Sequence, residues 1–221
     1  MGAPRMIEFG SETGIRGWLH EPAAPNGDAI LLTHGAGADC NSKLLVALAN
    51  AFAAAGVTVL RYDLPFRQER PHGPPRFGSA TRDREGIRRA AEAMKDRVRG
   101  RIFLGGHSYG GRQSSMLLAE EPQVAEGILL LSYPLHPPRK PGELRTAHFP
   151  KLARPTFFVH GTRDPFGSVE EMNAAIALIP GQHELLAIDG AGHDLVGKNR
   201  HGEFAQRIAG EFGAFVVRSC Q

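Results

Sequence analysis

The sequence of 221 residues has few of the features that mark secreted and membrane proteins. Its two cysteines, Cys40 and Cys220, are too few for a disulfide framework, and we interpret them as free thiols in a reducing compartment rather than as a disulfide. No apolar run approaches the ~20 residues of a membrane-spanning helix, and the first residues lack the apolar core of a secretory signal. The sequence therefore predicts a cytoplasmic protein with no membrane partner.

A strong charge of one sign is also missing. The chain has 26 Lys or Arg and 23 Asp or Glu, and the resulting net charge of +3 is too small to indicate a nucleic-acid partner. Positive charge is concentrated in residues 61–101, which hold 12 Lys or Arg against 6 Asp or Glu. A solvated helix face explains this excess, and an electropositive rim beside a functional site is the alternative.

Motifs for cofactors and metals are absent as well. No G-x-G-x-x-G or P-loop motif opens the chain, so no nucleotide cofactor is expected. No two histidines or carboxylates stand at ligand spacing within one expected element, so no metal site is expected either. The sequence thus predicts chemistry performed by side chains and backbone alone.

Short apolar runs alternate with amphipathic segments along the whole chain. Strands are expected at Met6–Phe9, Gly17–Glu21, Ala29–Thr33, Val57–Tyr62, Ile102–Leu104, Gly127–Ser132, Pro155–His160 and Leu185–Ile188. Helices are expected from Asn41 or Ser42 to Gly56, and at Thr81–Val98, Gly110–Glu120, Ser168–Ile179 and Glu203–Val217. This alternation predicts one α/β domain over residues 1–221, with a doubly wound, mostly parallel sheet of about seven to eight strands.

The most informative motif is G-x-S-x-G, which reads Gly106-His107-Ser108-Tyr109-Gly110 directly after an expected strand. A serine on a sharp strand-to-helix turn has a strained backbone, and the residues two before and two after it must lack interfering side chains. The following helix N-terminus favours negative charge that develops nearby. Ser108 is therefore the candidate nucleophile.

A carboxylate and a histidine follow Ser108 in the order that this turn requires. Asp164 comes after one expected strand and His193 after the next. The carboxyl ends of parallel strands meet at one edge of the sheet, so we expect the three side chains to converge there. Asp189 and Asp194 flank His193, but sequence neighbours reach its Nδ1 poorly, and Asp164 is the favoured partner.

A small-residue loop follows the expected strand Ala29–Thr33. Its glycines let backbone N–H groups approach a ligand closely, although an ordinary strand-to-helix turn has the same composition. In the functional interpretation, the N–H of Tyr109 and one from Ala36 or Gly37 form an oxyanion hole.

Two irregular segments, Phe66–Ala80 and Tyr133–Phe149, are expected to wall the site. About 22 residues separate the strands Gly127–Ser132 and Pro155–His160, which is too few for a large cap domain and predicts an open site for small esters or thioesters. The candidate substrate-binding residues are Phe66, Arg67, Leu135 and Phe166. Arg67 could meet a substrate carboxylate, with a plain surface arginine as the alternative.

The motifs H-G-A-G, G-H-S-Y-G-G, H-G-T-R-D and G-A-G-H, in this order, resemble those of the α/β-hydrolase superfamily. The longer stretches L-L-T-H-G-A-G-A-D, R-Y-D-L-P-F and L-S-Y-P-L-H-P-P are similar to a compact dienelactone-hydrolase-like branch. That branch also includes testis-expressed hydrolase-like proteins and a subunit of the NSL histone-acetyltransferase complex. The resemblance implies an eight-stranded fold and a serine hydrolase mechanism. Dienelactone hydrolases use a cysteine where this chain has Ser108.

These observations predict a serine hydrolase that acts on a small-molecule ester or thioester. One alternative is a non-catalytic binding or scaffold protein on the same fold, because some members of the branch resemble scaffolds. The other is a cofactor-free haloperoxidase or a peptidase that uses the same three residues.

Overall fold

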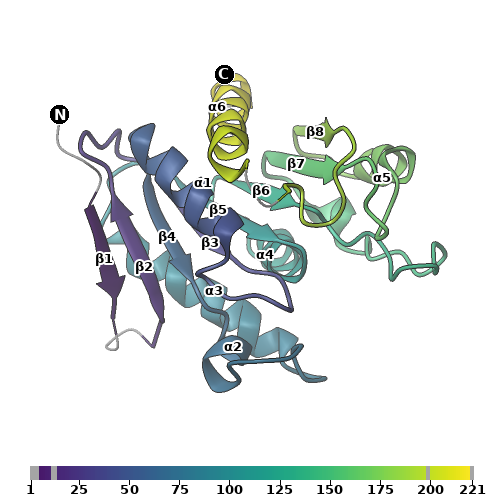
Figure 1. Cartoon of the computed structure of the whole chain (residues 1–221), viewed down its shortest axis with the longest axis horizontal. Coiled ribbons are helices and arrows are strands. Elements are labelled where there is room, and N and C mark those ends of the chain that lie inside the picture. Colours follow the sequence, from purple (N-terminus) through teal and green to yellow (C-terminus); the bar gives the residue numbers. More distant parts are fainter. Residues whose placement is uncertain (1–4, 11–13, 198–199, 220–221) are drawn as a thin grey trace.

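An eight-stranded sheet runs through the centre of the computed structural model, which describes residues 5–10, 14–197 and 200–219 (Figure 1). Its strands are β1 (Arg5–Phe9), β2 (Gly17–Glu21), β3 (Ala29–Thr33), β4 (Thr58–Tyr62), β5 (Ile102–His107), β6 (Gly127–Leu131), β7 (Thr156–Gly161) and β8 (His183–Ile188). They lie in the order β1-β2-β4-β3-β5-β6-β7-β8. The β1–β2 and β2–β4 pairs are antiparallel and all others are parallel. The predicted fold class is therefore confirmed.

Helices cover both faces of this sheet (Figure 1). The helices are α1 (Lys43–Ala54), α2 (Pro65–Glu69), α3 (Ala80–Lys95), α4 (Tyr109–Glu120), the 3-10 helix η2 (Phe149–Lys151), α5 (Val169–Ile176) and α6 (His201–Ser219). Because side chains alternate along a strand, Ile30 and Leu32 of β3 pack toward α1 and α6, whereas Leu31 packs toward α3 and α4. The central strands are buried on both faces, which explains their continuous apolar runs.

Two helix starts follow local signals in the sequence. Ser42 caps α1 by accepting a hydrogen bond from the N–H of Leu45, and Ser168 forms a capping box with Glu171 at the start of α5. The prediction of an irregular segment over Phe66–Ala80 was wrong at its start, because α2 occupies Pro65–Glu69. A five-residue helix opened by proline is too short to show a periodic pattern.

The connection between β6 and β7 carries no cap domain. Among the described residues 132–155 that form it, the only helix is the three-residue η2. No helix within the described ranges has an apolar stretch long enough to cross a membrane. Cys40 is a buried thiol, and Cys220 lies outside the described residues.

A histidine and an arginine are buried together between β2 and β4. His20 is 2% exposed, and its Nε2 accepts a hydrogen bond from Arg61 Nε at 2.9 Å. Burial, assisted by the charge of Arg61, lowers the pKa of His20 from 6.5 to about 4. Between pH 6.5 and about pH 4, the His20 imidazole is therefore neutral in the folded protein, whereas the same imidazole is protonated in the unfolded chain.

Replacing Gly111 by alanine should destabilise the fold. A Cβ there would lie 2.6 Å from the backbone oxygen of Gly106, so α4 must move away from the sheet. We expect a loss of about 2–4 kcal/mol in the free energy of unfolding, measured by urea denaturation. In the control Gly210→Ala, no atom lies within 4 Å of the new Cβ, and helix propensity favours alanine. Equal stability of the two variants would contradict this packing.

Acid should weaken the fold through His20. As the pH falls below 6.5 the unfolded chain binds a proton that folded His20 accepts only near pH 4, so the free energy of unfolding decreases over this window. The decrease from this group is at most about 3 kcal/mol. His20→Gln should flatten the pH dependence measured by denaturant titration between these pH values, and the exposed control His72→Gln should not. An unchanged slope in His20→Gln would refute the assignment.

Candidate active site

The turn between β5 and α4 holds Ser108 in a strained conformation. Its φ of 51° and ψ of −115° lie in a region that non-glycine residues rarely adopt. The neighbouring positions must be glycine because other atoms lie too close for a side chain. A Cβ on Gly106 would lie 2.5 Å from Gly111 N, and one on Gly110 would lie 2.5 Å from His34 O. The G-x-S-x-G spacing therefore reflects close packing of the turn against its own helix and the loop after β3.

The structure brings Ser108, His193 and Asp164 into one hydrogen-bond chain. His193 Nε2 lies 2.8 Å from Ser108 Oγ, and His193 Nδ1 lies 2.8 Å from Asp164 Oδ2. A carboxylate only accepts hydrogen bonds, so Nδ1 carries the proton and Nε2 is free to accept one from the serine hydroxyl. Ser108 follows β5, Asp164 follows β7 and His193 follows β8, so all three lie at the carboxyl edge of the sheet.

The environment keeps the Asp164 side chain ionised. Burial on its own raises the pKa of this carboxyl, but hydrogen bonds from His193 and from the N–H of Phe166 outweigh burial. The net effect is a pKa below the ordinary value of an aspartate. The buried carboxylate therefore carries a negative charge that stabilises a protonated His193.

Two aromatic rings hold His193 in place. The Phe166 ring lies 4.3 Å from the His193 ring, centroid to centroid, and the His107 ring lies 5.2 Å from it. His107 Nε2 donates a hydrogen bond to the backbone oxygen of His193 at 2.9 Å. Burial lowers the pKa of His107, so it remains a neutral donor. His107, which lies inside the serine motif, thus fixes the backbone of the histidine.

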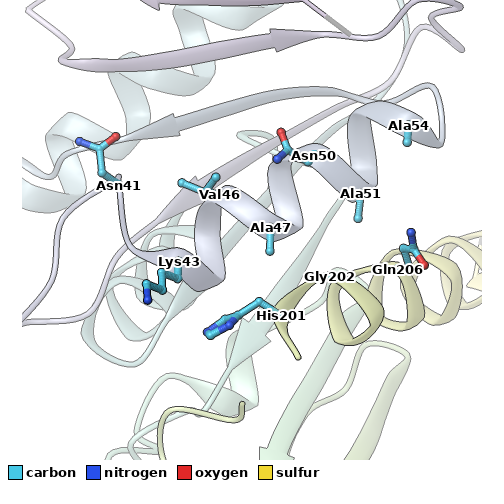
Figure 2. A pocket seen from close by; sticks show the side chains of 10 residues that line it. All are labelled: Asn41, Lys43, Val46, Ala47, Asn50, Ala51, Ala54, His201, Gly202 and Gln206. Carbon is cyan, nitrogen blue, oxygen red and sulfur yellow. The ribbon is translucent and has the colours of Figure 1, made fainter. Parts of the chain in front are cut away.

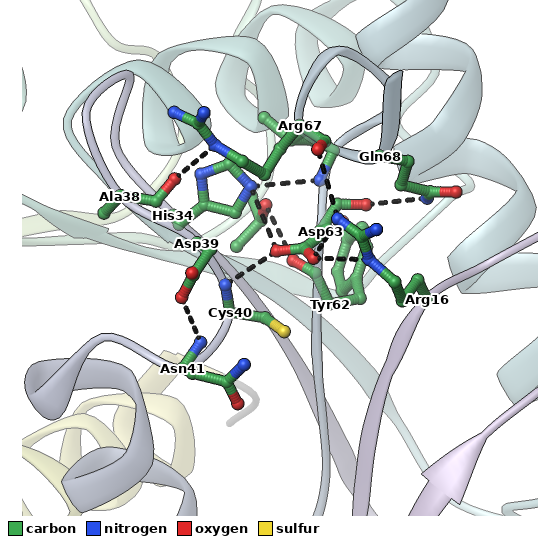
Figure 3. A network of polar contacts seen from close by, with 12 residues as sticks. Arg16, His34, Ala38, Asp39, Cys40, Asn41, Tyr62, Asp63, Arg67 and Gln68 are labelled. Carbon is green, nitrogen blue, oxygen red and sulfur yellow. Dashed lines mark hydrogen bonds and ion pairs between the residues drawn. The ribbon is translucent and has the colours of Figure 1, made fainter. Parts of the chain in front are cut away.

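The loop after β3 lies against the nucleophile turn. A Cβ on Gly35 would lie 3.5 Å from Ser108 Cβ and 3.0 Å from His107 Nδ1, so this backbone directly adjoins the serine. Figure 3 shows how the loop is tied to the segment after β4: the carboxylate of Asp63 accepts from Cys40 N at 2.7 Å and from Arg16 Nε at 2.9 Å. The contact with Cys40 ties the end of this loop to Asp63.

His34 adds a second tie between the same segments (Figure 3). Its Nε2 accepts from Leu64 N at 3.1 Å, so Nδ1 carries the proton and donates to Gly35 O at 2.8 Å. The side chain is fully buried, and burial lowers its pKa, which keeps the ring neutral. His34 is therefore a structural brace of the loop.

A buried carboxylate fixes the residue after the nucleophile. Asp83 of α3 is 0% exposed and accepts hydrogen bonds from the Tyr109 hydroxyl at 2.7 Å, from Phe66 N at 3.0 Å and from Ser79 Oγ at 3.2 Å. Because these bonds come from α4, α2 and the start of α3, Asp83 joins the nucleophile turn to two neighbouring elements. Tyr109, whose N–H is the predicted oxyanion donor, is thus held through its hydroxyl.

The predicted role of Arg67 in meeting a substrate needs correction. Arg67 is 2% exposed, and its guanidinium donates to the carbonyls of Ala36, Ala38, Arg70 and Gly73 at 2.8 to 3.0 Å. It also lies over the Phe66 ring, with its central carbon 5.0 Å from the centroid. With its donors directed at these carbonyls inside the protein, Arg67 anchors the loop after β3 instead of facing a ligand. The surface alternative is equally wrong.

The other three substrate-binding candidates differ in position. Phe166 is half-buried against His193 and faces the hydrogen-bond chain. Phe66 is 4% exposed and packs near His34 and Tyr109, with ring centroids 5.5 and 5.6 Å apart, although it also lines a cavity of about 140 Å³. Leu135 is 0% exposed and therefore presents no surface to a ligand.

The larger hollows of the surface do not include the three hydrogen-bonded residues. A groove of about 580 Å³ runs between α1 and α6, and Figure 2 shows its lining of small and polar side chains, among them Lys43 and His201. Within residues 5–10, 14–197 and 200–219, no group of His, Cys, Asp and Glu side chains has the arrangement of a metal site. The chemistry of the site therefore has to be derived from Ser108, His193, Asp164 and the neighbouring backbone.

Comparison with known proteins agrees with the fold. A family described as alpha/beta hydrolase domain matches residues 26–217, and the chain belongs to it. Among solved structures, a dienelactone hydrolase from Anabaena variabilis is similar, with a TM-score of 0.76 and 20% identity over 96% of this chain and 99% of that one. Est1E from Butyrivibrio proteoclasticus has a TM-score of 0.72 and 18% identity, covering 98% of this chain and 100% of its own. An esterase from Pyrococcus furiosus has a TM-score of 0.74 and 16% identity, covering 98% and 91%.

The resemblance of the motifs to the α/β-hydrolase superfamily is therefore confirmed, and membership of this family supports a hydrolase activity. At identities of 20% or less, the individual structures establish the shared fold alone. The fold similarity to a dienelactone hydrolase agrees with the resemblance of the longer sequence motifs to the dienelactone-hydrolase-like branch.

Reasoning from the sequence missed the residues that support the site. Asp63, Asp83 and the bracing role of Arg67 depend on contacts between elements that are distant along the chain. One signal was available: Asp83 is an acidic residue in the first turn of a helix whose inward positions are otherwise apolar. An acidic residue at a buried helix position needs donors from neighbouring elements.

Removing the Arg67 guanidinium should destabilise the loop after β3 rather than abolish binding of an anion. Arg67→Met leaves four carbonyls without their donor, and we expect the free energy of unfolding to fall by about 3–5 kcal/mol. Arg76→Met, at an exposed position in the same segment, is the control and should change stability by less than about 0.5 kcal/mol. Thermal and urea denaturation measure both. Wild-type stability of Arg67→Met would show that the clamp contributes little.

Proposed function

We propose that the protein is a serine hydrolase that cleaves small carboxylic esters or thioesters through an acyl-enzyme on Ser108. The observation that carries the proposal is the hydrogen-bond chain from Ser108 Oγ through His193 to Asp164, with both contacts at 2.8 Å. A serine hydroxyl is a weak nucleophile at neutral pH, and His193 in this hydrogen-bond chain is the base that activates it.

In the first half of the reaction, His193 Nε2 takes the proton of Ser108 while Oγ forms a bond to the substrate carbonyl carbon. Asp164 stabilises the protonated imidazole and holds its Nδ1–H. The tetrahedral intermediate then breaks its bond to the alkoxide or thiolate, which leaves with the proton from His193. In the second half, water gives a proton to His193 and attacks the acyl carbon. The collapse of this intermediate returns the proton to Ser108 and releases the acid.

Backbone N–H groups stabilise the oxyanion in this proposal. The N–H of Tyr109 lies at the first position of α4, where it has no partner within its own helix. For the second donor we favour Ala36 over Gly37, because Gly35 adjoins Ser108 and Arg67 holds the Ala36 carbonyl at 2.8 Å. Losing one such donor typically lowers the rate by about 10²–10³-fold.

The short connection between β6 and β7 supports the proposed substrate class. The β6–β7 connection carries only η2, and Phe166 provides an aromatic wall beside His193. The fold similarity to a dienelactone hydrolase and to an esterase supports ester chemistry. A non-catalytic scaffold has no physical need for an ordered serine, histidine and carboxylate in hydrogen-bond contact.

Ser108→Ala should abolish both hydrolysis of p-nitrophenyl acetate and labelling by a fluorophosphonate probe. We expect kcat to fall by at least about 10³-fold, because the nucleophile itself is removed. Ser114→Ala, a buried serine in the same helix, is the control and should keep labelling and most of the activity. A wild-type protein that reacts with neither reagent, although folded, would favour the scaffold alternative. Activity that survives in Ser108→Ala would disprove the assigned nucleophile.

A further inference from the structure

Two arginines beside the nucleophile turn have no carboxylate partner. Arg112 lies in α4, one turn after Ser108, and its N–H donates to Ser108 O at 3.0 Å. Arg145 lies in the β6–β7 connection, where its guanidinium donates to Pro134 O at 3.3 Å. Both side chains are half-buried. In the part of the chain that the structure describes, neither guanidinium has an Asp or Glu oxygen within 4.0 Å.

This situation differs from that of the other partly buried arginines. Arg84, Arg101 and Arg154 each form an ion pair, with Glu120, Asp28 and Glu126 respectively. The fully buried Arg61 and Arg67 donate to several carbonyls and side-chain acceptors. In contrast, Arg112 Nε is buried and has no hydrogen-bond partner among the described residues.

The two arginines belong to one polar cluster between α4 and the β6–β7 connection. The Tyr133 hydroxyl donates to Arg145 O at 2.6 Å, and a hydrogen bond of 2.8 Å joins His148 Nε2 to Ser115 Oγ. The rings of Tyr133 and His148 lie 6.4 Å apart. Tyr133, His148 and Ser115 are neutral groups. The one carboxylate that acts on Arg145 is that of Glu143, which is exposed and pairs with Lys140 at 2.8 Å, so the two positive charges are not neutralised by a direct ion pair.

Arg112 adjoins the cluster through Ser115, whose Oγ donates a hydrogen bond to Arg112 O at 2.9 Å, and its charge acts on the titratable groups there. Burial and then the charge of Arg112 lower the pKa of His148 to about 4, which keeps His148 neutral. Burial and the charge of Arg112 also lower the pKa of Arg145. Two like charges removed from water destabilise each other unless an anion lies between them.

The cluster lies within reach of an acyl group on Ser108. Arg112 is four residues from Ser108, which is about 6 Å along a helix axis. A long side chain in a helix points back toward the helix N-terminus, so the guanidinium is directed to the turn that contains the serine. The partly exposed residues of α4 are Tyr109, Arg112 and Met116, which share one face of the helix.

We propose that Arg112 and Arg145 bind the free carboxylate of a dicarboxylic half-ester or half-thioester whose other carbonyl is attacked by Ser108. This substrate class rests on the proposed hydrolase function. A planar guanidinium donates two parallel hydrogen bonds to a carboxylate, and a second arginine neutralises the remaining charge. Binding such a substrate removes the repulsion between the two cations, which a neutral acyl chain of the same length cannot do.

The test compares matched pairs of p-nitrophenyl esters. The charged members are the mono-p-nitrophenyl esters of glutaric and adipic acid, and the neutral members are p-nitrophenyl pentanoate and hexanoate. Ser108→Ala supplies the uncatalysed rate for each ester. We expect the wild type to prefer at least one charged ester over its neutral match by about tenfold or more in kcat/KM.

Arg112→Gln and Arg145→Gln should each remove most of this preference, mainly by raising KM for the charged ester. Hydrolysis of the neutral esters should stay within about threefold of the wild type, which also shows that the variants are folded. Arg154→Gln is the matched control, because Arg154 lies before β7 at the opposite edge of the sheet and already pairs with Glu126. This control should keep the wild-type preference.

Two outcomes separate failure of the site from failure of the function. Equal kcat/KM for the charged and neutral members of both pairs, or an equal loss of both in Arg112→Gln, overturns the carboxylate site and leaves the hydrolase standing. If no ester is hydrolysed and no probe labels Ser108, the hydrolase fails, and calorimetric titration with glutarate decides the site by itself. Glutarate binding that is lost in Arg112→Gln supports the arginine pair, and no binding to the wild type overturns it.

Discussion

The positive φ of Ser108 is the constraint on which the arrangement of the site depends. A left-handed serine is strained, and it persists only because its surroundings leave no alternative. Three glycines let α4, β5 and the loop after β3 close around it, and contacts of 2.5 to 2.6 Å exclude any larger residue at these positions. This backbone conformation directs the hydroxyl away from the end of a central strand, where the imidazole of His193 reaches it. Without this turn, the three side chains have no common meeting point.

Buried polar groups hold the loops around the Ser108 turn in one position. Asp63, Asp83 and Arg67 each join two or more elements, and each satisfies backbone groups that would otherwise be buried without partners. Removing such groups from water is unfavourable unless every hydrogen-bond partner is present. These networks therefore stabilise only the one arrangement of the loops in which all partners meet. Phe166 and His107 perform the same task for the ring and the backbone of His193. The site is thus positioned by its supporting residues as much as by the sheet.

The sequence predicted the fold class, the positions of the strands along the chain and the three residues that the structure joins by hydrogen bonds. These features have local signals: apolar runs, glycine spacing and short polar motifs at strand ends. The failures have a common cause. Helix α2 is too short for a periodic pattern, and Arg67 stands in a basic, proline-rich segment that looks exposed. Leu135 was expected to face a ligand, but Gly167 lets its side chain pack inward, since a Cβ there would lie 3.0 Å from Leu135 Cβ. Such burial is decided by contacts that no local pattern encodes.

The short β6–β7 connection also bears on the fate of the proposed acyl-enzyme. His193 remains 21% exposed at its side chain, and no cap domain separates it from the solvent. An ester bond formed at such an edge meets bulk water at full concentration, whereas enzymes that pass acyl groups to alcohols or amines must exclude water from the intermediate. The architecture therefore favours breakdown to the free acid over transacylation.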